Sequence, residues 1–159
     1  MAQIHASCVL LARAGEPFGA PADAGILLLG ESGSGKSDLA LRLIERGAVL
    51  VSDDRTDLFV EDGALLARPP RTLAGLIEVR GVGIVQLPHA ASARVRLAVC
   101  LSENPAARLP EHEFYQPPKE VLLAREAWPP LIRLSAKEPS APAKIAAAAA
   151  AHAHALFRD

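Results

Sequence analysis

The sequence has little of several features that mark particular classes of protein. Cysteine occurs only twice in 159 residues, at Cys8 and Cys100, and neither has ligand-like neighbours. No disulfide framework is needed, and we expect two small apolar cysteines in a reducing compartment. No apolar run reaches the roughly 18 residues that a membrane span requires, and no basic leader follows Met1. These absences predict a cytoplasmic protein without a membrane segment.

An excess of charge of one sign is also missing. Lys and Arg together number 17, Asp and Glu 18, and the formal net charge is -1. Such a balance provides no basic field for nucleic acid or anionic lipid, so partners must be recognised by local patches. Hydrophobic residues make up 50% of the chain. That content and length are enough for one buried core, and we expect a single domain over residues 1–159.

One glycine-rich stretch stands out against this background. It reads G-x-x-x-x-G-K-S, follows the apolar residues 26–29 and leads into an amphipathic helical pattern at 37–46. Glycines let successive backbone N–H groups point inward, and a helix N-terminus adds partial positive charge, so the stretch predicts a nucleotide phosphate site. In it, Lys36 would reach the β- and γ-phosphates and Ser37 would meet Mg²⁺. The predicted cofactor-binding residues are Gly30, Glu31, Ser32, Gly33, Ser34, Gly35, Lys36 and Ser37.

Two adjacent carboxylates follow the next predicted strand. Residues 48–51 are apolar, and Asp53 and Asp54 come directly after them. A strand, loop, helix and strand make the first unit of an α/β fold, and we expect helices on both sides of the buried strand 26–29. Ligands in such sheets bind beyond the carboxyl ends of the strands, so both aspartates should share an edge with Lys36 and Ser37. The pair is able to hold a metal or to take a proton.

The rest of the chain predicts short strands and one terminal helix. Glycines 81 and 83 interrupt a β-rich run, which is typical of a bulge or of a close approach of the backbone to a ligand. We expect strands at 4–12, 58–60, 64–66, 73–85, 94–101 and 131–134, loops at 15–25 and at 102–119 (with some helix in the second), and a helix at 141–157 anchored by Ile145 and Leu156.

Three further residues are candidates on their chemistry. Glu78 lies between Ile77 and Val79, where a buried charge would need a metal or a partner such as Arg80. Arg108 lies in a polar loop, in which a solvated role is the default. His5 lies in an apolar stretch, where a lone histidine is more often a buried imidazole than a catalyst. The residues by themselves leave all three open.

Several nucleotide-binding classes are not indicated. The sequence lacks the Gly-rich loop, H-R-D and D-F-G set of eukaryotic-type protein kinases. It also lacks the L-S-G-G-Q signature of transporter ATPases and the N-K-x-D of small GTPases.

Three segments in order resemble the catalytic domain of HPr kinase/phosphorylase. They are residues 30–37, residues 51–55 and residues 76–85, and the last is apolar-Glu-apolar-Arg-Gly-apolar-Gly-Ile. The resemblance covers residues 5–134 and implies a mixed sheet with flanking helices in a nucleotide-binding α/β fold. Members of the family use ATP and Mg²⁺ to phosphorylate a serine of the phosphocarrier protein HPr, and many reverse the reaction to pyrophosphate.

The resemblance also implies roles for residues. Asp54 looks like the base, with Asp53 beside it, and Lys36 looks like the phosphate-binding lysine. Ser37 and Glu78 look like the Mg²⁺ ligands. His5 and Arg108 fall where the family has a catalytic histidine and an essential arginine, so the expected catalytic residues are Asp54, Lys36, His5, Arg108 and Asp53.

The expected function is therefore an Mg-ATP-dependent serine kinase acting on HPr or a nitrogen-type paralogue. We expect the chain to lack the family's usual N-terminal domain and so to resemble the truncated type found in alphaproteobacteria. Family members form hexamers, which implies a homo-oligomer. The segment used for dephosphorylation is replaced by residues 131–144, where Arg133, Lys137 and Lys144 are possible substitutes, so the reverse reaction stays open. The alternatives are an ATP-binding sensing module with little turnover and a small-molecule kinase.

Overall fold

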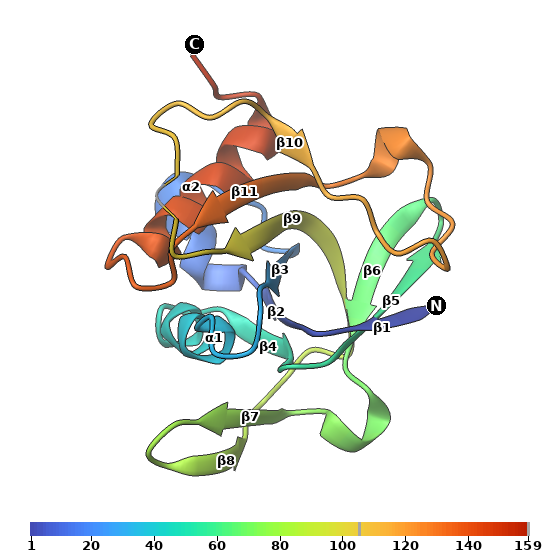
Figure 1. The fold of residues 1–159 in the computed structure, drawn as a ribbon, viewed down its shortest axis with the longest axis vertical. Helices are drawn as coiled ribbons and strands as arrows, with labels where there is room; N and C mark the ends of the chain where they lie inside the picture. Colours follow the sequence, from blue (N-terminus) through green and yellow to red (C-terminus); the bar gives the residue numbers. More distant parts are fainter. Residues whose placement is uncertain (105, 159) are drawn as a thin grey trace.

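The computed structural model, which describes residues 1–104 and 106–158, shows a curled mixed sheet with few helices (Figure 1). Nine described strands join in one sheet, in the order β1-β5-β6-β9-β3-β2-β4, with β11 beside β9 and β10 beside β11. The other two strands, β7 and β8, form a separate hairpin beside β4 and α1 (Figure 1).

The elements have the following bounds. The strands are β1 (Ala2–Ile4), β2 (Ala6–Leu10), β3 (Ala24–Leu29), β4 (Val49–Ser52), β5 (Thr56–Glu61), β6 (Ala64–Arg68), β7 (Leu76–Val79), β8 (Gly83–Gln86), β9 (Ala93–Leu101), β10 (Glu113–Phe114) and β11 (Pro130–Leu134). The helices are α1 (Lys36–Glu45), α2 (Ala141–His154) and the short 3-10 segments η1 (Ala12–Phe18), η2 (Arg71–Leu73) and η3 (Arg125–Ala127).

The centre of the sheet consists of β9, β3, β2 and β4. Strand β3 runs parallel to β9 and antiparallel to β2, and β2 is in turn antiparallel to β4. Strands β3 and β4 therefore point the same way with β2 between them, so they are not the direct neighbours of a simple β-α-β unit. Their carboxyl ends nevertheless share one edge of the sheet, as the sequence predicts.

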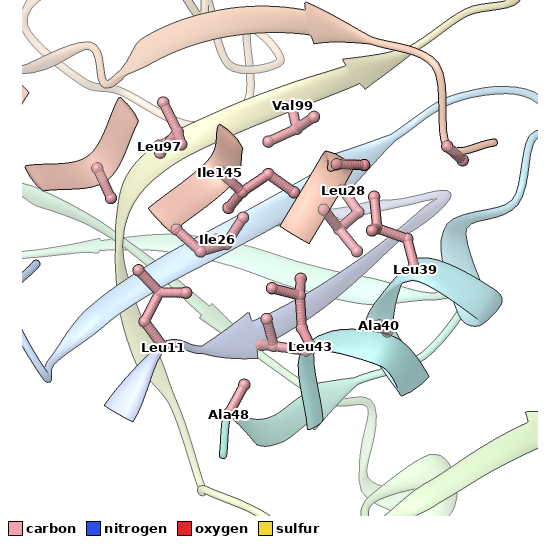
Figure 2. Close-up of a cluster of buried hydrophobic side chains, with 14 of the residues drawn as sticks. Leu11, Ile26, Leu28, Leu39, Ala40, Leu43, Ala48, Leu97, Val99 and Ile145 are labelled. Carbon is pink, nitrogen blue, oxygen red and sulfur yellow. The ribbon is translucent and has the colours of Figure 1, made fainter. Parts of the chain in front are cut away.

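Both main helices cover the same face of the sheet. Leu39 and Leu43 of α1 and Ile145 of α2 are buried in one cluster with Ile26 and Leu28 of β3 (Figure 2). Residues three and four apart share a helix face, and alternate strand residues share a sheet face, so these spacings build a continuous apolar layer.

The expectation of helices on both sides of β3 is wrong. Leu27, which faces away from α1, packs instead with Leu58 of β5 and Leu65 of β6, and with Val121 in a connecting segment. The long strand β9 causes this closure, because its first residues pair with β6 while its last residues pair with β11. The sheet curls and covers its own second face.

Most of the predicted strands are confirmed, namely those at 26–29, 48–51, 58–60, 64–66, 94–101 and 131–134, and so is the helix that follows the glycine-rich loop. The expected strand 4–12 is split at His5, and residues 12–18 form η1 instead of an extended chain and loop. The run 73–85 is not one strand: Gly81 lies in the turn of the β7–β8 hairpin, and Gly83 is the first residue of β8.

The C-terminal half differs from the prediction in two places. The described part of residues 102–119 contains the short strand β10 and no helix. Helix α2 ends at His154, and Leu156 beyond it is 47% exposed, so only Ile145 of the two expected anchors is buried. None of the described helices is both long enough and apolar enough to cross a membrane.

Both cysteines are free, in agreement with the sequence. Cys8 is buried among apolar side chains, and burial raises the pKa of its thiol to about 12. Cys100 is partly exposed. Neither thiol contributes to a disulfide in this fold.

Candidate functional site

The glycine-rich loop, residues 30–35, connects the end of β3 to the start of α1. Gly30, Gly33 and Gly35 all have positive φ, at 155°, 82° and 97°. Gly35 caps α1 without a side-chain hydrogen bond, so the first N–H groups of that helix are available to an external acceptor. The local sequence thus produces an uncapped helix start, a feature that suits the binding of an anion.

The side chain of Lys36 lies inside this loop and bonds to its backbone. Its side chain is 5% exposed, and Nζ donates to the carbonyl oxygens of Gly30 at 2.7 Å and Glu31 at 3.0 Å. Burial lowers the pKa of Lys36 below its usual value, and the nearby carboxylates of Asp54 and Asp53 act in the opposite direction. The ammonium is held inside the loop, where a bound anion would meet it.

We expect the Gly35→Ala substitution to destabilise the loop more than Gly33→Ala does. Both glycines have positive φ, which costs an L-residue about 1–2 kcal/mol. A Cβ on Gly35 would also lie 2.8 Å from Ala136 Cβ, whereas a Cβ on Gly33 would meet nothing within 4 Å. Urea unfolding of both variants would measure the difference. Equal losses of unfolding free energy would show that the contact with Ala136 is relieved at no cost.

Asp53 is the most enclosed carboxylate of the site. It is 8% exposed, and its Oδ1 accepts hydrogen bonds from Ser37 Oγ at 2.6 Å and Ser7 Oγ at 2.9 Å. Its Oδ2 accepts the backbone N–H of Glu78 at 3.0 Å. Three residues from segments far apart in the sequence therefore donate hydrogen bonds to the Asp53 carboxylate. These bonds stabilise a charge that would be costly to bury alone.

Asp54 has an unusual backbone conformation. Its φ is 66°, and the N–H of Arg55 donates to the carbonyl of Asp53 at 2.7 Å across it. A hydrogen bond from residue i+2 to residue i around a positive φ is the strained form of the γ-turn. The turn leaves the Asp54 side chain 57% exposed, with Oδ1 at 2.5 Å from Nε2 of His5.

Glu78 does not lie in a core, contrary to the sequence-based interpretation. It is exposed on β7, and Ile84 of β8 pairs with it across the hairpin. Because a two-stranded hairpin has one open face, a charged side chain on that face needs no partner. The backbone of Glu78 is anchored by Asp53, and its side chain borders a cavity.

That cavity lies on one side of the glycine-rich loop and has a volume of about 350 Å³. Lys36, Ser37, Asp54, Glu78 and Arg80 line it together with part of the loop. A second cavity of about 630 Å³ lies on the other side of the loop, beside the ends of β9 and β11, and includes Arg133 and Lys137. Most of the site residues that the sequence predicts therefore line one cavity.

Arg108 is the predicted site residue that lies elsewhere. It is exposed in the segment between β9 and β10, and it is absent from the described lining of both cavities. His5 borders the site through Asp54 rather than by lining the cavity.

Sequence reasoning missed one polar residue of the site, Ser7, and gave Arg80 no role beyond a salt bridge. Ser7 is fully buried, and the only signal for it was a serine at an inward position of a strand that begins directly after His5. Arg80 lines the cavity but has no ion pair with Glu78 among the described residues.

The fold and the site define a class: an α/β protein whose glycine-rich loop and paired aspartates lie together at the carboxyl edge of a curled mixed sheet. The family model described as HPr Serine kinase C-terminal domain matches residues 21–97, which contain the loop, both aspartates and the β7–β8 hairpin. Over these residues the chain is similar to the C-terminal domains of HPr serine kinases.

Individual relatives show the same similarity. The chain is 52% identical over 63 residues to HPr kinase/phosphorylase of Clostridium beijerinckii, covering 40% of the chain and 21% of that protein. It is 45% identical over 85 residues to HPr kinase/phosphorylase of Streptococcus thermophilus, covering 48% of the chain and 28% of that protein. The chain therefore matches less than a third of the length of either relative.

A solved structure shares the fold over nearly the whole chain. The Hpr(Ser) kinase/phosphatase from Coxiella burnetii superimposes with a TM-score of 0.71 at 24% sequence identity, covering 98% of this chain and 97% of that one. The curled sheet and its few helices are therefore an arrangement that the two proteins have in common.

Proposed function

We propose that this protein is an Mg-ATP-dependent serine kinase whose substrate is the phosphocarrier protein HPr or a nitrogen-type paralogue. One observation carries the proposal: Lys36, Ser37, Asp54 and Glu78 line a single cavity against the glycine-rich loop. Phosphoryl transfer needs a phosphate cradle, a metal ligand and a group that accepts the proton of the nucleophile, and these residue types supply each of them. The named relatives are HPr kinases/phosphorylases.

The nucleotide would be held by its phosphates. The N–H groups of the loop and of the first turn of α1 donate to phosphate oxygens, and the helix start adds positive potential. Lys36 supplies the full positive charge. Its Nζ contacts the carbonyls of Gly30 and Glu31 and no carboxylate within residues 1–104 and 106–158. On nucleotide binding, the ammonium would exchange these neutral acceptors for phosphate oxygens.

Ser37 and Glu78 would hold Mg²⁺. Hydroxyl and carboxylate oxygens are the hard ligands that this ion takes, and it keeps several waters and substrate phosphates as its other ligands. Ser37 fits the role because its hydroxyl donates a hydrogen bond to Asp53, which leaves the lone pairs of its oxygen free to coordinate a cation. No cluster of three or more His, Cys, Asp or Glu that would hold a metal by itself occurs in residues 1–104 and 106–158. The ion supplies charge neutralisation at the phosphates when it is bound.

Asp54 would act as the base. The acceptor serine hydroxyl enters the cavity, its oxygen forms a bond to the γ-phosphorus, and its proton passes to the Asp54 carboxylate. The bond between the γ-phosphorus and the β–γ bridging oxygen breaks, and ADP leaves. Nε2 of His5, 2.5 Å from Oδ1, keeps this carboxylate oriented toward the open side of the site.

Two arginines are candidates for stabilising charge on the transferred group. Arg80 lines the cavity, and its position on the β7–β8 hairpin suits that role. Arg108 retains the role that the family resemblance implies, although it is exposed and outside both cavity linings. Its contribution would require the segment between β9 and β10 to reach the site once substrate is bound.

The proposal is tested by transfer of labelled γ-phosphate from Mg-ATP to purified phosphocarrier proteins. A matched phosphocarrier in which the acceptor serine is replaced by alanine is the control. We expect label on the serine form and none on the alanine form. Binding of ATP without transfer to any phosphocarrier would contradict the kinase and favour the sensing module.

Two further parts of the proposal concern direction and assembly. Addition of inorganic phosphate to the labelled phosphocarrier tests the reverse reaction, which releases pyrophosphate. We also propose that the chain acts in the cytoplasm as one catalytic domain that forms a homo-oligomer, and light scattering in solution tests the assembly. A mass equal to one chain would overturn it.

A further inference from the structure

Ser7 is a fully buried hydroxyl placed between the two aspartates of the site. Its Oγ donates to Oδ1 of Asp53 at 2.9 Å and accepts the backbone N–H of Asp54 at 3.1 Å. The side chain is 0% exposed. It is thus the one described side chain with hydrogen bonds to both aspartates, and the roles proposed above do not use it.

The position of Ser7 follows from the register of the sheet. Cys8 of β2 pairs with Ser52 of β4, so Ser7 falls opposite Asp53, one step beyond the end of β4. Along the same face of β2, Val9 is part of the apolar core beneath α1. A hydroxyl buried on this face of β2 costs free energy unless it is hydrogen-bonded, and both hydrogen bonds of Ser7 go to the aspartate pair.

The bond to Asp54 acts where the backbone is strained. Asp54 is at the apex of the γ-turn, with φ at 66°. Such a conformation persists only when its surroundings fix it. The N–H of Asp54 is fixed by Ser7, and the carbonyl of Asp53 is fixed by the N–H of Arg55. Ser7 therefore joins the turn to the rigid centre of β2.

We infer that Ser7 is a positioning residue, which holds the turn so that the Asp54 carboxylate faces His5 and the cavity. It does not touch the reacting atoms, because Asp53 and the backbone of Asp54 enclose it. The inference rests on the proposed function to the extent that Asp54 is the base. The geometry of the turn is a property of the protein alone and is testable without substrate.

Amide hydrogen exchange provides the test that is independent of activity. In Ser7→Ala, the Asp54 N–H loses its acceptor, and we expect it to exchange about tenfold faster, as the loss of one hydrogen bond implies. Ser7→Thr keeps the hydroxyl and should restore protection. Ser52→Ala is the matched control, because Ser52 is also buried but bonds to Thr56 at 2.6 Å rather than to an aspartate. Unchanged exchange at Asp54 in Ser7→Ala would overturn the inference.

Kinetics provides the second readout. We expect Ser7→Ala to lower kcat about tenfold while KM for the nucleotide stays the same, since the loop and Lys36 are intact. Ser7→Thr should recover kcat, and Ser52→Ala should keep it. If Ser7 had only a structural role, Ser7→Ala and Ser52→Ala would have similarly lowered melting temperatures, and Ser7→Ala would show no separate loss of kcat at constant KM. That result would count against positioning. Absence of transfer in the unmodified protein would refute the kinase, while the exchange experiment would still decide the role of Ser7.

Discussion

The Asp54→Asn substitution is expected to lower the rate of phosphate transfer by roughly 10²–10⁴-fold, the contribution of a positioned general base. Asparagine has nearly the same shape as aspartate and tolerates the positive φ of 66° at this position. The turn and the contact to His5 are therefore kept, and only the capacity to accept the serine proton is lost. ATP affinity should be unchanged, because in the proposed site the loop and Lys36, and not Asp54, hold the phosphates. Single-turnover transfer together with ATP titration measures both quantities.

Asp62→Asn is the matched control for this experiment. Asp62 is also an aspartate with positive φ, at 51°, and lies exposed in the turn between β5 and β6. Both substitutions make the same chemical change in a similar backbone conformation, and only one of them is made in the cavity. Transfer by Asp54→Asn at the unmodified rate would remove Asp54 from the role of base, and an equal loss in Asp62→Asn would mean that the effect is not specific to the site.

The Lys36→Met substitution is expected to weaken ATP binding about 10- to 100-fold, since a hydrogen bond to a charged group contributes ~1.5–3 kcal/mol and each 1.4 kcal/mol is a factor of ten. Methionine fills the same volume without the ammonium. Transfer should fall further, because the negative charge on the transferred group is then not compensated. Isothermal titration with ATP and the transfer assay measure the two effects.

The stability of the Lys36→Met protein should change little. Burial disfavours the charged form of Lys36, as its lowered pKa shows, so loss of the charge offsets loss of the bonds to the two loop carbonyls. Lys144→Met is the control, because Lys144 pairs with Glu138 at 2.8 Å on the first turn of α2 and is half exposed. Full ATP affinity in Lys36→Met would show that the backbone amides of the loop are sufficient for binding.

The parts of the site that the sequence predicts are those built from neighbouring residues. The loop and α1 follow from glycine spacing and helical periodicity, and both elements are confirmed. The proximity of Ser37 and Asp53 follows from the rule that parallel strands end at one edge of the sheet. In the structure, Ser37 Oγ lies 2.6 Å from Asp53 Oδ1. Each of these inferences needs only local pattern and one general rule of sheet topology.

The parts that were missed depend on pairings distant in the sequence. Glu78 was interpreted as a buried charge because its neighbours are apolar, but among the described strands β7 pairs with β8 alone, and that face stays open. The hairpin position also brings the N–H of Glu78 to Asp53. The local sequence of a strand does not show how many of its faces are covered, so the exposure of Glu78 could be learned only from the fold.

The sequence by itself determined the chemistry available to this protein: a glycine-rich loop, a lysine, a serine and two aspartates, each at the end of a strand or the start of a helix. Only the tertiary structure decided how these groups are held. The insertion of β2 between β3 and β4 places Ser7 beside Asp53 and His5 beside Asp54, 46 and 49 residues away along the chain. The physical reason is that strand order and register are set by the packing of whole faces, and a shift of one residue would turn Ser7 to the opposite side of the sheet.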